Sequence, residues 1–210
     1  SRNCLAQNPL LDAEFKRPIV EQQPKIEKLS TDFIHEIDSH LPESIRLAYR
    51  FACSTGLRAG EQRALTWDDI DFKMSEVNVR RSAKLKVVVN DEIEKHGVGL
   101  VKTNTSNRIV PIPGKILKEL KELYIKKGRP GKTNFVFGTK YNTMIGRSYW
   151  LEQLQKVVKK VSNKTLRGHD LRHYYASKML EHFGDDIWTV SNLMGHSDIK
   201  ITQNVYGHWM

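Results

Sequence analysis

Apolar residues recur at helical spacing towards both ends of this chain, whereas strand-like patterns are confined to its middle. The clearest helical stripe covers residues 43–55 and ends at Gly56. Six further segments have helical character: 31–41, 59–65, 114–127, 150–161, 170–183 and 187–194. Alternating or β-branched residues predict strands at 76–81, 85–89 and 100–113, with turns at 90–91, Gly97 and Gly99. The sequence therefore predicts an α+β fold that is mainly α-helical and has a small antiparallel β-sheet.

The first 28 residues show no such periodicity. Three residue–proline pairs interrupt them, at Asn8-Pro9, Arg17-Pro18 and Gln23-Pro24. A chain of 210 residues is long enough for one large domain with its own core. We therefore expect a linker over 1–28 and a single domain over 29–210.

The chain carries an excess of positive charge, with 34 Lys and Arg against 24 Asp and Glu, or +10 in all. This excess favours a polyanionic partner, nucleic acid first and an anionic membrane surface second, although a basic protein without such a partner has the same composition. No apolar run is long enough to span a membrane. Two cysteines without CxxC spacing indicate a reducing, cytosolic setting.

Arginine, histidine and tyrosine occur in short clusters that are far apart in the sequence. Arg58 ends the string 55–58, His169 and Arg172 stand three residues apart, and Tyr206 follows His196 by ten residues. On a helix, His169 and Arg172 share one face, which we expect to point outward from the core. Two arginines, two histidines and a phenol hydroxyl are the groups that a metal-free attack on a phosphodiester requires.

Each cluster alone has a plainer interpretation. Arg58 and Glu61 could form a surface ion pair, and Tyr206 could be an ordinary half-buried aromatic residue. His169 and His173 are four residues apart, which resembles the HExxH zinc spacing, but no obvious third ligand follows. We expect no metal site. Near the C-terminus, helix-capping chemistry predicts a helix that begins at Ser197.

Taken together, the clusters resemble the catalytic domain of the tyrosine recombinase family, the phage-integrase type. The matching segments are 55–61 (first arginine box), 102–113 (β-hairpin lysine box), 169–177 (second arginine box), 193–196 (third box) and 205–206 (nucleophile). They stand in the family's order, and the resemblance covers nearly the whole chain. It implies the catalytic-domain fold over 29–210, with 1–28 as the linker from a missing N-terminal core-binding domain.

The resemblance also implies a role for each catalytic residue. Tyr206 is expected to attack the scissile phosphorus and form a 3′-phosphotyrosyl link, while Arg58 and Arg172 hold the non-bridging oxygens. His196 is expected to donate a further hydrogen bond, and His169 to act as the base or proton relay for Tyr206.

Three further residues complete the expected site. Lys102 is expected to protonate the leaving 5′-oxygen, and Glu61 to orient Arg58. Contacts with DNA are expected from Arg58, Lys102, Arg108 and Arg172. No cofactor or metal ion is implied.

By the same resemblance, the protein is expected to be a site-specific recombinase or integrase that integrates or excises a mobile genetic element. Expected partners are double-stranded DNA attachment sites, a homotetramer of the full-length protein and accessory DNA-bending proteins, with no membrane. The expected location is the prokaryotic cytoplasm, associated with the nucleoid. Three alternatives remain at this point: a type IB topoisomerase-like enzyme, a non-catalytic DNA-binding module, and a zinc hydrolase built on His169 and His173.

Overall fold

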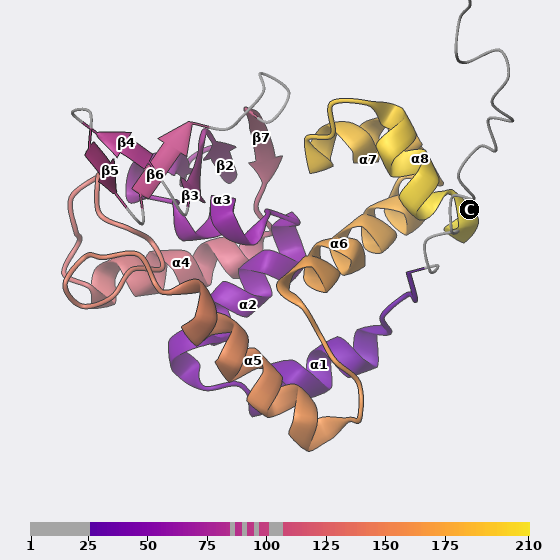
Figure 1. Cartoon of the computed structure of the whole chain (residues 1–210), viewed down its shortest axis with the longest axis horizontal. Coiled ribbons are helices and arrows are strands. Elements are labelled where there is room, and N and C mark those ends of the chain that lie inside the picture. The colour runs from indigo at the N-terminus through magenta and orange to yellow at the C-terminus, as the bar shows by residue number, and fades with distance from the viewer. Residues whose placement is uncertain (1–25, 85–86, 90–91, 95–96, 101–106) are drawn as a thin grey trace, which may run out of the picture.

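The computed structural model describes residues 26–84, 87–89, 92–94, 97–100 and 107–210, and it confirms the predicted, mainly helical α+β fold (Figure 1). The helices are α1 (Thr31–His40), α2 (Glu43–Thr55), α3 (Ala59–Arg63), α4 (Gly114–Lys126), α5 (Arg147–Val161), α6 (Gly168–His182), α7 (Ile187–Met194) and α8 (Ile199–Tyr206). Two short 3-10 helices are η1 (Trp67–Asp69) and η3 (Gly207–Trp209). In this described part of the chain, no helix combines the length and the apolar character that crossing a membrane needs.

The described strands form three antiparallel sheets. One sheet has the order β1 (Ile70–Asp71), β2 (Glu76–Val79), β7 (Arg108–Pro111), and two-stranded pairings join β3 (Arg81–Lys84) to β6 (Gly97–Leu100) and β4 (Val87–Val89) to β5 (Glu92–Glu94). The predicted turn at Gly97 and Gly99 is therefore wrong. Gly99 pairs with Ser82, and the Lys84 side chain lies over it, where a Cβ would come within 2.6 Å of Lys84 Nζ. The turn predicted at 90–91 lies outside the described residues.

Several helices begin or end at or near the residues predicted from the sequence. The structure gives α2 and α7 the predicted bounds, whereas α6 begins two residues earlier than expected, at Gly168. The prediction that Ser197 caps the last helix is wrong by one residue, because the Asp198 carboxylate accepts the N–H of Lys200 at 2.8 Å. Phe183, the last residue of the helical segment predicted over 170–183, follows the end of α6 and is exposed.

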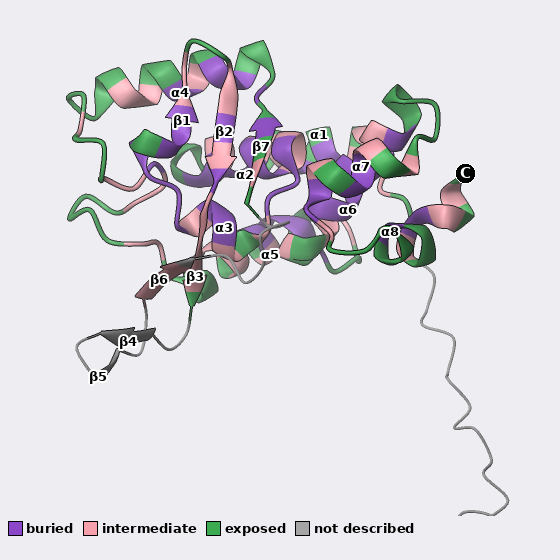
Figure 2. Cartoon of the chain, turned by 90° about the horizontal axis from the view of Figure 1, so that it is seen from above, coloured by how far each residue is buried: buried purple, intermediate pink, exposed green. Residues whose placement is uncertain are grey.

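Three groups of buried side chains hold these elements together. The β1–β2–β7 sheet packs on α4 through residues such as Val77, Val110 and Leu120. Helices α1, α2, α5 and α6 share a second group, and α6, α7 and α8 share a third that contains Tyr206. Burial is therefore concentrated along α2 and α6 (Figure 2). Because α6 belongs to two of these groups, the residues it carries are held rigidly.

Gly56 ends α2 in the left-handed conformation, with φ +61°. A Cβ on Gly56 would lie 2.2 Å from Cδ1 of Tyr175, a buried residue of α6. We therefore expect Gly56→Ala to lower the free energy of unfolding by about 2–4 kcal/mol, from left-handed strain together with overpacking. Urea denaturation followed by circular dichroism would measure this change.

Gly128 provides the matched control for that substitution. It also has a positive φ, +75°, but a Cβ there meets no heavy atom within 4 Å. Gly128→Ala should therefore show only the left-handed strain, about 1–2 kcal/mol. Equal losses in the two variants would contradict the tight contact between Gly56 and Tyr175.

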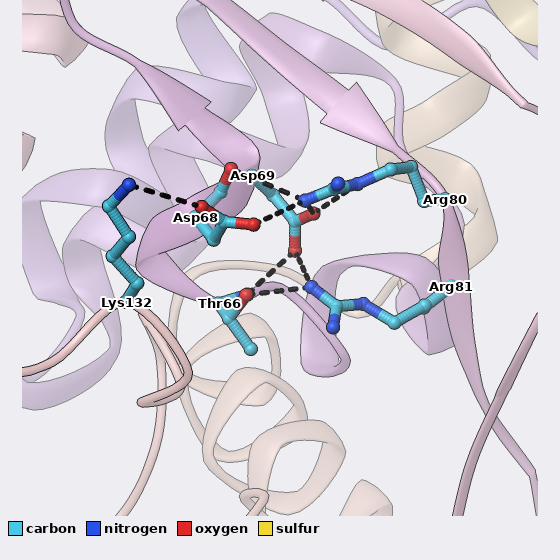
Figure 3. Close-up of polar contacts among 6 residues, drawn as sticks. All are labelled: Thr66, Asp68, Asp69, Arg80, Arg81 and Lys132. Carbon is cyan, nitrogen blue, oxygen red and sulfur yellow. Dashed lines mark hydrogen bonds and ion pairs between the residues drawn. The ribbon is translucent and has the colours of Figure 1, made fainter.

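A buried carboxylate anchors the start of β3 (Figure 3). Asp69 accepts hydrogen bonds from Arg80 Nη2 at 2.6 Å, from Arg81 Nη2 at 2.6 Å and from the Thr66 N–H at 2.9 Å. At the rim of this cluster, Arg80 also contacts Asp68. Strand β3 begins at Arg81, so the network fixes the base of the β-hairpin that continues towards Lys102. Figure 1 shows that this hairpin lies at the end of the molecule opposite α7 and α8.

Candidate active site

Arg172 lies at the centre of the candidate site, and it points inward. The prediction that the Arg172 side chain projects outward from α6 is wrong, because the residue is only 1% exposed. Its Nη1 donates to the Gly56 carbonyl at 2.7 Å, its Nη2 donates to the Met194 carbonyl, and its Nε has no partner among the described residues. Burial, followed by the nearby Arg58 and Arg108, lowers the pKa of Arg172 to about 9. The guanidinium therefore stays charged at neutral pH.

Arg58 and Glu61 open helix α3 beside it. Glu61 is 2% exposed and accepts the Arg58 backbone N–H at 2.9 Å and Arg58 Nη1 at 2.8 Å. The pair is therefore not the surface ion pair that the plainer interpretation suggested. Arg58 itself keeps 37% of its side chain exposed, and its Nη2 donates to the Gly195 carbonyl at 3.3 Å. The contacts thus place Glu61 where it can orient Arg58 and leave Arg58 open to solvent.

Arg108 reaches the same carboxylate from β7. Its Nη2 lies 2.9 Å from Glu61 Oε2, its Nε donates to the Leu193 carbonyl at 2.8 Å, and only 6% of its side chain is exposed. Gly195 allows this close approach, since it has φ +64° and a Cβ there would lie 2.9 Å from Arg108 Cδ. The expected contact between Arg108 and DNA stays a prediction. In the structure, its guanidinium bonds both to Glu61 and to the Leu193 carbonyl, and so connects Glu61 to the end of α7.

All three arginines donate hydrogen bonds to the C-terminal end of α7. Consecutive carbonyls of residues 193, 194 and 195 accept hydrogen bonds from Arg108, Arg172 and Arg58, respectively. The last carbonyls of a helix have no partner within the helix and carry the negative end of its dipole, so they suit cationic donors. Within this network, three guanidinium groups face one carboxylate, that of Glu61. Among the described contacts, this arrangement would favour an anion at the partly exposed Arg58.

Two histidines flank the arginines. The Nδ1 of His196 lies 2.7 Å from the hydroxyl of Thr202, which is buried in α8. Burial and then the three arginines lower the pKa of His196 to about 4, so its ring is neutral at pH 7. In the tautomer whose Nδ1 accepts from the Thr202 hydroxyl, the ring proton lies on Nε2, where it can donate to an anion. His169 is exposed, and burial of part of its ring followed by Arg172 and Arg58 lowers its pKa.

Tyr206 ends α8 and is almost completely buried, with 1% of its surface exposed. Its hydroxyl lies 2.8 Å from Nδ1 of His173, and its ring also packs against Trp209. Burial raises the pKa of Tyr206 to about 12 and lowers the pKa of His173 to about 4. The phenol is therefore protonated and the imidazole neutral, and the tautomer of His173 decides which of the two groups donates.

Sequence reasoning considered His173 only as a zinc ligand and missed its contact with Tyr206. Among the described hydrogen bonds, the Tyr206 hydroxyl pairs with His173 and not with His169, the expected base. His169 instead makes an edge-to-face ring contact with His173 at 4.8 Å. The described residues contain no cluster of three His, Cys, Asp or Glu that could hold a metal. Lys102 lies outside the described residues, and its role stays a prediction.

A helical domain that gathers arginines and histidines beside a buried tyrosine near its C-terminus is typical of the tyrosine recombinases. Comparison with known sequences agrees: residues 25–210 match the Phage integrase family, and the chain belongs to that family. The predicted resemblance is therefore confirmed.

Named relatives fall in the same family. A XerC-like tyrosine recombinase of Caldanaerobacter subterraneus subsp. tengcongensis is 31% identical over 229 residues, covering 97% of this chain and 56% of the relative. The ICEBs1 integrase of Bacillus subtilis is 32% identical over 171 residues, covering 76% of this chain and 44% of the relative. The chain thus spans about half the length of these relatives.

Solved structures confirm the fold. The Tn1549 transposon integrase, in complex with transposon right-end DNA, superposes with a TM-score of 0.70 at 20% identity, over 89% of this chain and 62% of that one. The catalytic domain of bacteriophage HP1 integrase superposes with a TM-score of 0.56 at 19% identity, over 88% and 89% of the two chains. The structure is therefore that of a tyrosine recombinase catalytic domain.

Proposed function

We propose that the protein is a site-specific DNA recombinase that cleaves and rejoins DNA through a 3′-phosphotyrosyl intermediate, and that it integrates or excises a mobile genetic element. The assembly of Arg58, Arg108 and Arg172 on the end of α7, next to the Tyr206 hydroxyl, carries this proposal. Its surplus positive charge suits a phosphodiester. Relatives named recombinases and integrases support the same activity, and the Tn1549 integrase structure contains transposon DNA.

The arginines would stabilise the transition state. Arg58 is partly exposed and Arg172 Nε has no partner among the described residues, so both have N–H groups to offer to the non-bridging oxygens as negative charge grows there. One such donor contributes about 3 kcal/mol, or about two orders of magnitude in rate. His196 Nε2 would add a neutral donor. Glu61 and Arg108 would hold Arg58 in place without contacting the phosphate.

Tyr206 would supply the nucleophile and Lys102 the acid. The Tyr206 Oη–P bond forms while the P–O5′ bond breaks, and the leaving 5′-oxygen takes a proton from the Lys102 ammonium group. The phosphotyrosyl ester preserves the phosphodiester linkage, so a 5′-hydroxyl can attack it and rejoin the strand without ATP. No metal ion or cofactor enters these steps.

The proposed partners extend beyond this chain. We expect two double-stranded attachment sites held by a homotetramer of the whole protein, with residues 1–28 leading to a core-binding domain that clamps the DNA. Accessory DNA-bending proteins and a cytoplasmic, nucleoid-associated location belong to the same proposal. The net charge of +10 supports a DNA partner.

A trapping experiment tests the function. The protein would be mixed, with excess EDTA, with a nicked duplex that contains the attachment site of its own element, so that the cleaved end diffuses away. We expect a protease-sensitive protein–DNA adduct on a denaturing gel, and mass spectrometry should locate a 3′-phosphate on Tyr206. A matched duplex with a scrambled site is the control. DNA binding without an adduct would instead indicate a non-catalytic module, and relaxation of supercoils without exchange between sites would indicate a topoisomerase-like enzyme.

A further inference from the structure

The geometry points to His173, rather than His169, as the group that accepts the Tyr206 proton when the tyrosine attacks DNA. This inference rests on the proposed function and deepens it by naming the base. His173 touches the reacting atom directly, with its Nδ1 2.8 Å from Tyr206 Oη. That distance is within the range that proton transfer to a general base requires.

The pair is enclosed by the protein. Both residues are buried between α6 and α8, where the exposed fractions are 9% for His173 and 1% for Tyr206. The proposal requires the tautomer in which the imidazole proton lies on Nε2, because the Nδ1 lone pair then faces the Tyr206 Oη–H bond. In this tautomer the acceptor is in place before DNA binds.

Bound DNA would make His173 a better base. In the structure, burial first and then the positive groups nearby disfavour the imidazolium form. A phosphodiester held by Arg58 and Arg172 has the opposite charge, so it offsets those groups and favours a protonated ring. Transfer is then expected to accompany attack: the Oη–P bond forms, the P–O5′ bond breaks, and the Oη proton moves to His173 Nδ1. During rejoining, the same proton returns to Tyr206 as it leaves the phosphorus.

His169 has a different role from His173 in the proposed proton transfer. Its ring lies edge-to-face against His173 at 4.8 Å, and it is exposed. Among the described ring contacts and hydrogen bonds, it therefore contacts His173 and not Tyr206. Replacing His169 should alter the rate less than replacing His173 does.

Two substitutions separate proton transfer from simple positioning. In His173→Asn, the amide oxygen can still accept the Tyr206 hydrogen bond but cannot take the proton; in His173→Ala, both functions are lost. We expect single-turnover adduct formation to fall by about 10²–10⁴-fold in both variants. Added imidazole should restore part of the rate in His173→Ala, with more basic imidazoles restoring more. His182→Asn, on an exposed position of the same helix, is the matched control and should react normally.

Thermal unfolding and DNA binding of each variant would be measured in parallel, so that a folding defect is recognised. A His173→Asn rate equal to wild type would show that only positioning matters and would overturn the inference. Loss of activity in His173→Ala without any response to imidazole would overturn it too. Either result leaves the wild-type adduct, and with it the proposed function, intact. A wild-type protein that forms no adduct would overturn the function itself.

Discussion

A protein with Tyr206→Phe is expected to bind attachment-site DNA as wild type does and to form no covalent adduct with it. The substitution removes only the hydroxyl, and the remaining ring still packs against Trp209 within the α6–α8 core. The phosphate contacts are expected from the arginines, which the substitution does not alter. The chemical step, however, has no nucleophile. The loss of adduct should therefore be complete, whereas stability should fall by only about 1–3 kcal/mol, because His173 Nδ1 loses its partner in the interior.

Denaturing gels of the nicked duplex would measure the adduct, and electrophoretic mobility shifts at fixed salt would measure binding. Tyr141→Phe is the matched control, since Tyr141 is an exposed tyrosine and should form the adduct at the wild-type rate. An adduct that persists in Tyr206→Phe would contradict the assignment and would require another nucleophile. Weakened binding would instead place the tyrosine hydroxyl in a contact with DNA.

Local sequence patterns predicted the elements of this fold because the relevant forces act over a few residues. The stripe over 43–55 and the glycine that follows it set both ends of α2, since the left-handed conformation at Gly56 stops the helix. Glycine is an unreliable guide within the β-hairpin. Gly97 and Gly99 resembled a turn, but they belong to β6, where the Lys84 side chain covers Gly99.

The candidate site could be predicted only in part, because its geometry depends on contacts between distant segments. The motifs identify Arg58, Arg172 and Tyr206 as a set, since their chemistry is complementary to a phosphodiester. Nothing local shows that three arginines share the carbonyls of residues 193–195. Likewise, His169 and His173 both lie on α6, and only the packing of α8 decides that His173 meets the tyrosine. The inward direction of the Arg172 side chain likewise depends on contacts with distant segments of the chain.

Replacing Glu61 with alanine should cause the largest loss of stability in this site. Glu61 is the carboxylate to which both Arg58 and Arg108 are bonded, and it is 2% exposed. Without it, the nearly buried guanidinium of Arg108 loses the carboxylate to which it is bonded at 2.9 Å. Removing one partner of a buried ion pair costs about 3–5 kcal/mol, so we expect a decrease of this size in the free energy of unfolding, measured by urea denaturation. Adduct formation should fall as well, because Arg58 is no longer oriented.

The pH dependence of stability distinguishes the charge of Glu61 from its packing as the cause of this loss. Burial alone would raise the pKa of Glu61, but hydrogen bonds and charge from Arg108 and Arg58 hold it below the ordinary value. Its stabilisation is therefore complete above that ordinary pKa, about 4.3, and is lost as the pH falls through the lower, folded value. The stability difference between wild type and Glu61→Gln should stay constant from pH 5 to 8 and shrink below about pH 4.

Glu43 offers the comparison that decides what holds the arginines. Its carboxylate forms an ion pair with Lys126, in which both side chains are exposed, so Glu43→Ala should leave stability nearly unchanged. If Glu61→Ala were equally mild, the helix-end carbonyls of α7 would suffice to keep Arg58, Arg108 and Arg172 together. If the loss is large and the pH dependence disappears with it, the carboxylate is required to offset the repulsion among three cations. The phosphate site would then depend on one acidic residue that never contacts DNA.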